Sequence, residues 1–150
     1  MSLTVMKLMN AKAFIDTNIF VYTQRTDDPK KRQIAIDAVN HFDCVASTQV
    51  LNEISNVFTK KYPMPAERVE YLLRSISEIS EIVVVNEPII YDALRFHQRY
   101  KIPYYDSLMI AAAVYAQCRL LISEDMQNNF FINSTLRIVN IFNVNLNDLG

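Results

Sequence analysis

Two spacings of hydrophobic residues alternate along the chain. Short apolar runs predict buried strands, and longer segments with apolar residues at every third or fourth position predict amphipathic helices. The predicted strands cover residues 12–15, 44–47, 81–86, 119–123 and 136–142. The predicted helices cover residues 17–23, 27–42, 48–62, 65–80, 87–101 and 103–117, with Pro29 in a first turn and Thr48 as an N-cap.

This alternation predicts an α/β fold in which helices flank a central, mostly parallel sheet of four to five strands. The length of 150 residues suits a single domain, 1–150, and no internal repeat or linker divides it. We expect residues 1–11 to be ragged and partly derived from cloning, and residues 143–150 to form a polar tail. The helix over 103–117 is almost wholly apolar and should be the most buried.

Composition narrows the class of protein. The net charge of −1 argues against a protein that binds nucleic acid by bulk positive charge alone. Two cysteines make no disulfide framework, which favours a cytoplasmic protein. The longest apolar stretch, 108–116, is far shorter than the roughly 20 residues of a membrane helix, so no membrane association is expected. The single glycine, Gly150, excludes a glycine-rich phosphate loop.

An acid stands at the end of the first predicted strand. Asp16 follows the apolar run 12–15 and is followed at once by Thr17 and Asn18. Thr and Asn both favour a turn or a helix start, so Asp16 is either a helix cap or a functional group. In parallel sheets, functional sites gather at the carboxyl ends of strands, and that is where Asp16 lies.

Three further acids occupy related positions. Asp125 follows the strand 119–123, whereas Glu53 and Asp106 begin helices that leave the same edge of the predicted sheet. Each acid alone has a structural explanation: Asp106 as an N-cap, Asp125 as a turn residue and Glu53 as a solvated helix acid. Together with Asp16 they are expected to converge on one rim.

The chemistry follows from the ligand type. Carboxylates without His or Cys suit Mg²⁺ or Mn²⁺, which can activate water and stabilise the oxygens of a phosphodiester displacement. Thr17, Asn18 and Ser123 are candidates to orient the ligands. The densest basic run contains the candidate residues for binding nucleic-acid phosphates, Arg25, Lys30, Lys31 and Arg32.

Four stretches resemble the PIN-domain nucleases, most closely the VapC-type ribonuclease toxins of prokaryotic toxin–antitoxin pairs. They are FIDTNIFVY, STQVLNEISNVF, PYYDSLMIAAAVYAQCRLLISEDMQ and LRIVNIF. The resemblance runs from about residue 13 to 142 and is most specific over 106–125. It implies that Asp16, Glu53, Asp106 and Asp125 are the catalytic, metal-binding tetrad of that family, with Asn18 and Ser123 at its conserved polar positions.

The resemblance further implies a Mg²⁺- or Mn²⁺-dependent endoribonuclease that leaves a 3′-hydroxyl and a 5′-phosphate on its RNA substrate. It implies a homodimer and an antitoxin protein that blocks the site. Many relatives have a glycine soon after the last acid; here Asn128 and Asn129 follow it, and Asn can also adopt positive φ. Two alternatives stay open: a PIN nuclease for RNA processing or structured DNA, and a catalytically silent PIN-like binding module.

Overall fold

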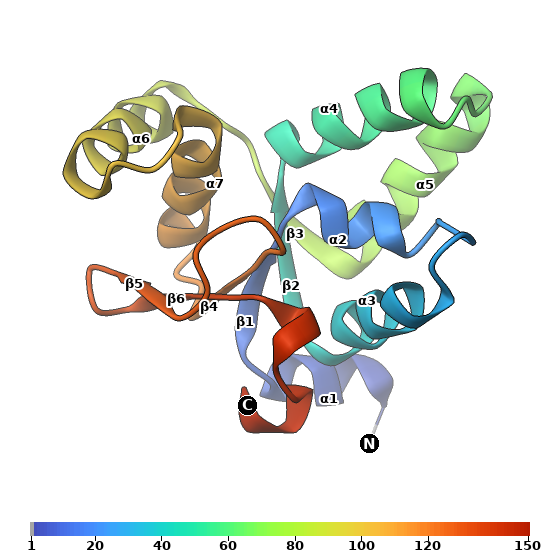
Figure 1. The fold of residues 1–150 in the computed structure, drawn as a ribbon, viewed down its shortest axis with the longest axis horizontal. Helices are drawn as coiled ribbons and strands as arrows, with labels where there is room; N and C mark the ends of the chain where they lie inside the picture. The colour runs from blue at the N-terminus through green and yellow to red at the C-terminus, as the bar shows by residue number, and fades with distance from the viewer. Residues whose placement is uncertain (1) are drawn as a thin grey trace.

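The computed structural model describes residues 2–150, in which helices and strands alternate (Figure 1). The helices are α1 (Leu3–Met9), α2 (Thr17–Tyr22), α3 (Pro29–His41), α4 (Thr48–Asn56), α5 (Ala66–Ile79), α6 (Glu87–Tyr100) and α7 (Tyr104–Tyr115). The strands are β1 (Lys12–Ile15), β2 (Asp43–Ser47), β3 (Ser80–Val83), β4 (Leu120–Ile122), β5 (Phe130–Ile132) and β6 (Leu136–Val139). A π-helical turn, Val57–Lys61, continues α4, and two short 3₁₀ helices, Ile141–Asn143 and Leu146–Asp148, follow β6.

The strands form one sheet in the order β3-β2-β1-β4-β6-β5. All neighbours pair in parallel except β5 and β6, which confirms the predicted α/β fold with a mostly parallel sheet. The sheet has six strands instead of four to five. The additional strand is β5, whose three residues are too few to show a hydrophobic period and which pairs with β6 only as a hairpin edge.

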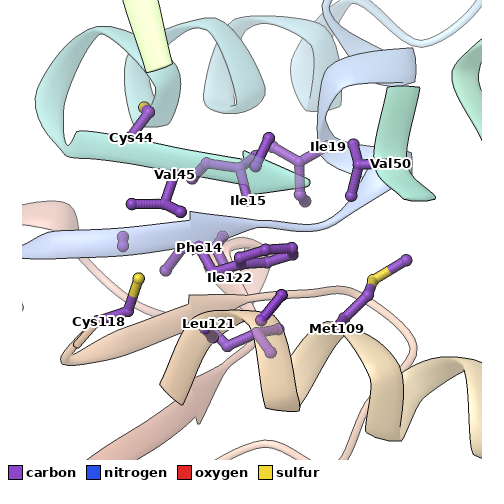
Figure 2. Packing of buried hydrophobic residues seen from close by; sticks show 14 of the residues in the cluster. Phe14, Ile15, Ile19, Cys44, Val45, Val50, Met109, Cys118, Leu121 and Ile122 are labelled. Carbon is purple, nitrogen blue, oxygen red and sulfur yellow. The ribbon is translucent and has the colours of Figure 1, made fainter. Parts of the chain in front are cut away.

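Helices cover both faces of the sheet. Figure 1 shows α6 and α7 together on one side, and α2 to α5 on the other. Side chains from β1, β2, β4, α2, α4 and α7 meet in the core (Figure 2). Residues 107–113 of α7 are all buried, as their apolar sequence predicts. No helix in residues 2–150 combines the length and the hydropathy that crossing a membrane requires.

The start of α4 differs from expectation in its cap. Ser47, not Thr48, is the N-cap residue, and its hydroxyl accepts a hydrogen bond from the backbone N–H of Val50. The hydroxyl of Thr48 instead accepts from the N–H of Val85, at 3.1 Å. Thr48 therefore ties the start of α4 to the segment that follows β3, a contact between residues too distant in sequence for a capping pattern to reveal.

Both ends of the chain are more ordered than the sequence suggests. Instead of a ragged segment, residues 3–9 form α1, and Lys7 Nζ donates to the carbonyl of Val39 at 2.8 Å. Met1 lies outside the described residues. The polar tail contains the 3₁₀ helix Leu146–Asp148, and Leu149 is buried. The Lys7 side chain docks the first end and Leu149 the second, and single contacts of this kind leave no pattern in the sequence.

Candidate active site

Asp16 lies where β1 ends and α2 begins, and the structure shows the first of the two roles that the sequence left open, that of a helix cap. Its Oδ1 accepts a hydrogen bond from the N–H of Thr17 at 2.6 Å, which makes it the N-cap residue of α2. Its Oδ2 accepts from the hydroxyl of Ser123 at 2.8 Å. Ser123 directly follows β4, which pairs in parallel with β1, so the two residues emerge at the same edge of the sheet.

Burial makes the Asp16 carboxylate costly to ionise. The side chain is almost wholly removed from water, and this desolvation raises its pKa to about 6. The hydrogen bonds from Ser123 and from the Thr17 N–H act in the opposite direction, because they stabilise the charged form. The negative charges of Glu53 and Asp106 raise the pKa further, which shows that these acids lie near Asp16.

The two residues after Asp16 each donate to one of the other acids. The Thr17 hydroxyl donates to Glu53 Oε2 at 2.7 Å, and the Asn18 amide donates to Asp125 Oδ2, also at 2.7 Å. Glu53 is half-buried on α4, whereas Asp125 is exposed in the loop after β4. One short stretch at the end of β1 therefore positions carboxylates from two distant segments.

Asp106 lies in the first turn of α7 and is not its N-cap residue. The helix begins at Tyr104 with Pro103 in the cap position, so the capping explanation of Asp106 is wrong. Asp106 is half-buried, and its pKa is raised by desolvation and by the charges of Glu53 and Asp125. A partly buried acid without a capping function is a candidate for binding a ligand.

The four acids line one open pocket of about 440 Å³. The complete lining is Asp16, Thr17, Asn18, Asn52, Glu53, Asn56, Val57, Asp106, Met109 and Asp125. In residues 2–150, no three His, Cys, Asp or Glu side chains lie in a ready-made metal-binding arrangement. The donor set of carboxylate and amide oxygens nevertheless fits a hard divalent cation. Burial is the main cause of the raised pKa values of Asp16 and Asp106, and the charges of the neighbouring acids add to it.

Sequence comparison supplies the family. The family model described as the PIN domain matches residues 13–129, which is most of the chain. The chain belongs to the PIN-domain family. Nucleases of this family generally depend on divalent metal ions. No curated protein matches the sequence.

Solved structures share the fold of this PIN domain. A toxin–antitoxin complex from Klebsiella pneumoniae is 20% identical, with a TM-score of 0.65, and the match covers 88% of this chain and 99% of that one. Mycobacterium tuberculosis VapC20, described as a Sarcin-Ricin loop cleaving toxin, is 13% identical, with a TM-score of 0.61 and coverages of 73% and 86%. VapBC2 from Rickettsia felis, bound to a DNA fragment from its promoter, is 16% identical, with a TM-score of 0.61 and coverages of 86% and 99%.

The expected basic run lies beside the acidic pocket and not in its lining. Its members are Arg25, Lys30, Lys31 and Arg32. The Arg25 guanidinium pairs with Asp27 at 2.6 Å, and Lys31 Nζ pairs with Glu124 at 2.9 Å. Because Glu124 immediately precedes Asp125, the Lys31 pair brings the start of α3 next to the rim of the pocket. Part of the charge of the run is thus neutralised within the protein.

One face of α4 carries site residues that the sequence analysis missed. Asn52 and Asn56 line the acidic pocket with Glu53, and Gln49 donates to Glu53 Oε1 at 3.5 Å. These four residues follow the spacing i, i+3, i+4, i+7, which puts them on one side of a helix. Polar residues at this spacing around Glu53 are the sequence signal that would have identified these site residues.

The loop after Asp125 keeps its shape without a glycine. Asn129 has a φ of 60°, in the left-handed region, which asparagine adopts more readily than most residues. Its side chain helps to hold the loop, because Asn129 Oδ1 accepts from Arg137 Nη2 at 2.6 Å. Asn128 Oδ1 accepts from the N–H of Asn140 at 2.8 Å.

Ser123→Ala should lower the free energy of unfolding by about 1–3 kcal/mol, because a buried carboxylate and a buried backbone N–H each lose a hydrogen-bond partner. The Ser123 hydroxyl donates to Asp16 and accepts from the N–H of Met126 at 3.2 Å. Urea denaturation measures the change. Ser80→Ala is the matched control, since the Ser80 hydroxyl is buried without a hydrogen-bond partner in the described chain. An equal loss in both variants would show that the Ser123 bonds contribute nothing.

Proposed function

We propose that this PIN domain is a Mg²⁺- or Mn²⁺-dependent endoribonuclease and the toxin of a toxin–antitoxin pair, active in the cytoplasm as a homodimer. The observation that carries the proposal is that carboxylates from four separate segments line one pocket at the edge where β1 and β4 end. Carboxylates that crowd together repel one another, and a bound cation offsets that repulsion.

Asp16, Glu53, Asp106 and Asp125 would hold the cation. A divalent cation lowers the pKa of water and offsets the charge that develops on a phosphodiester during hydrolysis. Three polar side chains orient the acids, because each donates a hydrogen bond to one carboxylate and so restricts its rotation. They are Thr17, Asn18 and Ser123. In the part of the chain that the structure describes, the Asp106 carboxylate is the one of the four without such a donor, so it is freer to adjust when substrate enters.

The toxin role rests on the proteins that share this fold. The solved structures that resemble it include toxin–antitoxin complexes, and one is described as a toxin that cleaves the Sarcin-Ricin loop, an RNA target. We therefore propose RNA as the substrate and a cognate antitoxin protein as the partner that blocks the pocket.

Cleavage of a labelled RNA tests the proposal directly. Purified protein is incubated with a structured RNA in EDTA, Mg²⁺ or Mn²⁺, and a matched single-stranded and duplex DNA are run alongside. We expect cleavage of RNA only with a divalent ion, leaving 5′-phosphate ends. Cleavage of DNA alone would favour the DNA-processing alternative, and no cleavage under any condition would favour the silent binding module.

Neutralising the basic run should weaken RNA binding and flatten its dependence on salt. The triple variant Lys30→Ala, Lys31→Ala, Arg32→Ala removes three positive charges. Each side chain that no longer pairs with a phosphate should reduce the slope of log K against log salt by about 0.7 for single strands. Anisotropy titrations at several salt concentrations measure the slope. Arg74→Ala with Arg95→Ala, two exposed cations on α5 and α6 outside the lining of the acidic pocket, is the control. An unchanged slope in the triple variant would exclude the run as an RNA-binding surface.

A further inference from the structure

A second pocket adjoins the acidic one. It has a volume of about 450 Å³ and is lined by Thr48, Gln49, Asn52, Glu53, Val85, Tyr105 and Leu108. Asn52 and Glu53 belong to the lining of both pockets. A polymer held with a phosphate at the acids would therefore present a neighbouring nucleotide to this second pocket.

Tyr105 presents an aromatic surface at this pocket. Its side chain is 68% exposed, which is unusual for a large aromatic residue at a helix start packed on its neighbours. The ring of Tyr104 meets it edge-on, with ring centres 5.4 Å apart, and so limits the positions it can take. An exposed, positioned aromatic ring beside a polar groove is the platform on which unpaired bases stack in single-strand-binding proteins.

Gln49 belongs to the same lining and carries a hydrogen-bond acceptor that is unpaired within residues 2–150. Its Nε2 donates to the carbonyl of Tyr105 at 3.0 Å and to Glu53, which fixes the orientation of the amide. Its Oε1 is buried and has no hydrogen-bond partner among the described residues. A buried acceptor without a partner is uncommon and costly, and a donor from a ligand would satisfy it. All four RNA bases carry an N–H donor on the edge that pairing would cover: an amino group in adenine, cytosine and guanine, and a ring N–H in guanine and uracil.

We propose that this second pocket is a subsite for an unpaired nucleobase of the RNA strand, next to the phosphate that is cleaved. The base stacks on Tyr105, rests against the apolar side chains of Val85 and Leu108, and donates an N–H to Gln49 Oε1. The position of this base beside the cleaved phosphate rests on the proposed nuclease function. The subsite requires that this one base be unpaired, since a paired base cannot expose both a face and an edge.

Binding of RNA in EDTA tests the subsite without cleavage. Fluorescein-labelled single-stranded octamers, one intact and the others each with one abasic position, are titrated against wild type and Tyr105→Ala. We expect Tyr105→Ala to raise the Kd of the intact octamer about tenfold. Removing the base at one position of the octamer should weaken binding to wild type by a similar factor. The same removal should not weaken binding to Tyr105→Ala, because the ring and the base form one contact.

Matched variants separate stacking from general surface change. Tyr105→Phe keeps the ring and should bind as wild type does. Tyr115→Ala removes an equally exposed tyrosine, 65% accessible, from the other end of α7 and should also bind as wild type does. Gln49→Met keeps the length of the side chain and removes the acceptor, so the ranking of octamers that differ in the base at the sensitive position should flatten.

The outcomes distinguish this proposal from the nuclease proposal. Suppose that wild type cleaves RNA and that Tyr105→Ala has an unchanged Kd and an unchanged cleavage pattern. The subsite proposal would then be wrong and the nuclease proposal would remain. The same result is expected if the pocket receives a side chain of a protein partner. A wild-type protein that cleaves nothing but shows the paired loss with the abasic octamer would overturn the nuclease and retain the base subsite. An unchanged ranking of bases in Gln49→Met would remove Gln49 from it.

Discussion

Asp106→Asn should lower kcat/KM for RNA cleavage by at least about a hundredfold while the protein stays folded. Asparagine has the size of aspartate, and Asp106 is not the N-cap residue of α7, so the start of the helix should be unaffected. The substitution removes one negative charge from a cluster that includes Glu53 and Asp125, whose charges raise the Asp106 pKa. Initial rates on a labelled RNA with Mg²⁺, together with thermal melts, measure both effects.

Glu67→Gln is the matched control for Asp106→Asn. Glu67 also lies in the first turn of a helix, α5, but it is exposed and outside the acidic pocket. It should change kcat/KM by less than about twofold, because a single exposed charge remote from the reacting atoms contributes little. Equal rates for wild type and Asp106→Asn would remove Asp106 from the catalytic set and leave it as a structural acid.

The general architecture was predictable because parallel strands that are buried on both faces appear in the sequence as short apolar runs. The apolar runs that became β1, β2 and β4 need no context to be recognised, and their alternation with helical patterns requires parallel pairing. The positions of Asp16 and Asp125 followed from the same rule, since each acid closely follows such a run. The sequence therefore located these two acids through the strands that carry them.

Contacts between distant segments were not predictable. The bond from Thr17 to Glu53 joins residues 36 positions apart, and the ion pair of Lys31 with Glu124 joins residues 93 positions apart. Periodicity describes which face of an element is buried, but it says nothing about which partner that face meets. The neutralisation of part of the basic run and the pairing of Gln49 with the Tyr105 carbonyl are both of this kind.

The acidic pocket carries an electrostatic cost that links its chemistry to folding. Asp16 is buried, its pKa is raised to about 6, and its unfolded value is near 3.8. The folded protein therefore takes up a proton at Asp16 before the unfolded chain does as the pH falls. As the pH falls from about 7 through 6 towards 4, the contribution of Asp16 to stability without metal should therefore rise, the reverse of the usual carboxylate trend.

In EDTA, we expect lowering the pH from about 7.5 to about 5 to stabilise wild type relative to Asp16→Asn by about 1 kcal/mol, or roughly 2–4 °C in Tm. Asn caps a helix about as well as Asp, so the start of α2 should survive the substitution. The difference between the two proteins cancels the other titrating groups, and melts at both pH values measure it. Wild type and Asp16→Asn with the same response to pH would show that Asp16 ionises normally.

Divalent metal should change the stability more than acid does. With metal bound, the stability should fall instead of rise as the pH is lowered. A cation that binds only the folded state raises the free energy of unfolding by about 2.7 kcal/mol at a hundredfold excess over Kd. Mg²⁺ or Mn²⁺ at pH 7.5 should thus raise the Tm of wild type, and acid should cancel this increase because protons compete for the same carboxylates. The Tm of Asp16→Asn should rise far less. A wild-type Tm that is indifferent to both ions would mean that the four acids hold no cation, and that Asp16 serves only as the cap of α2.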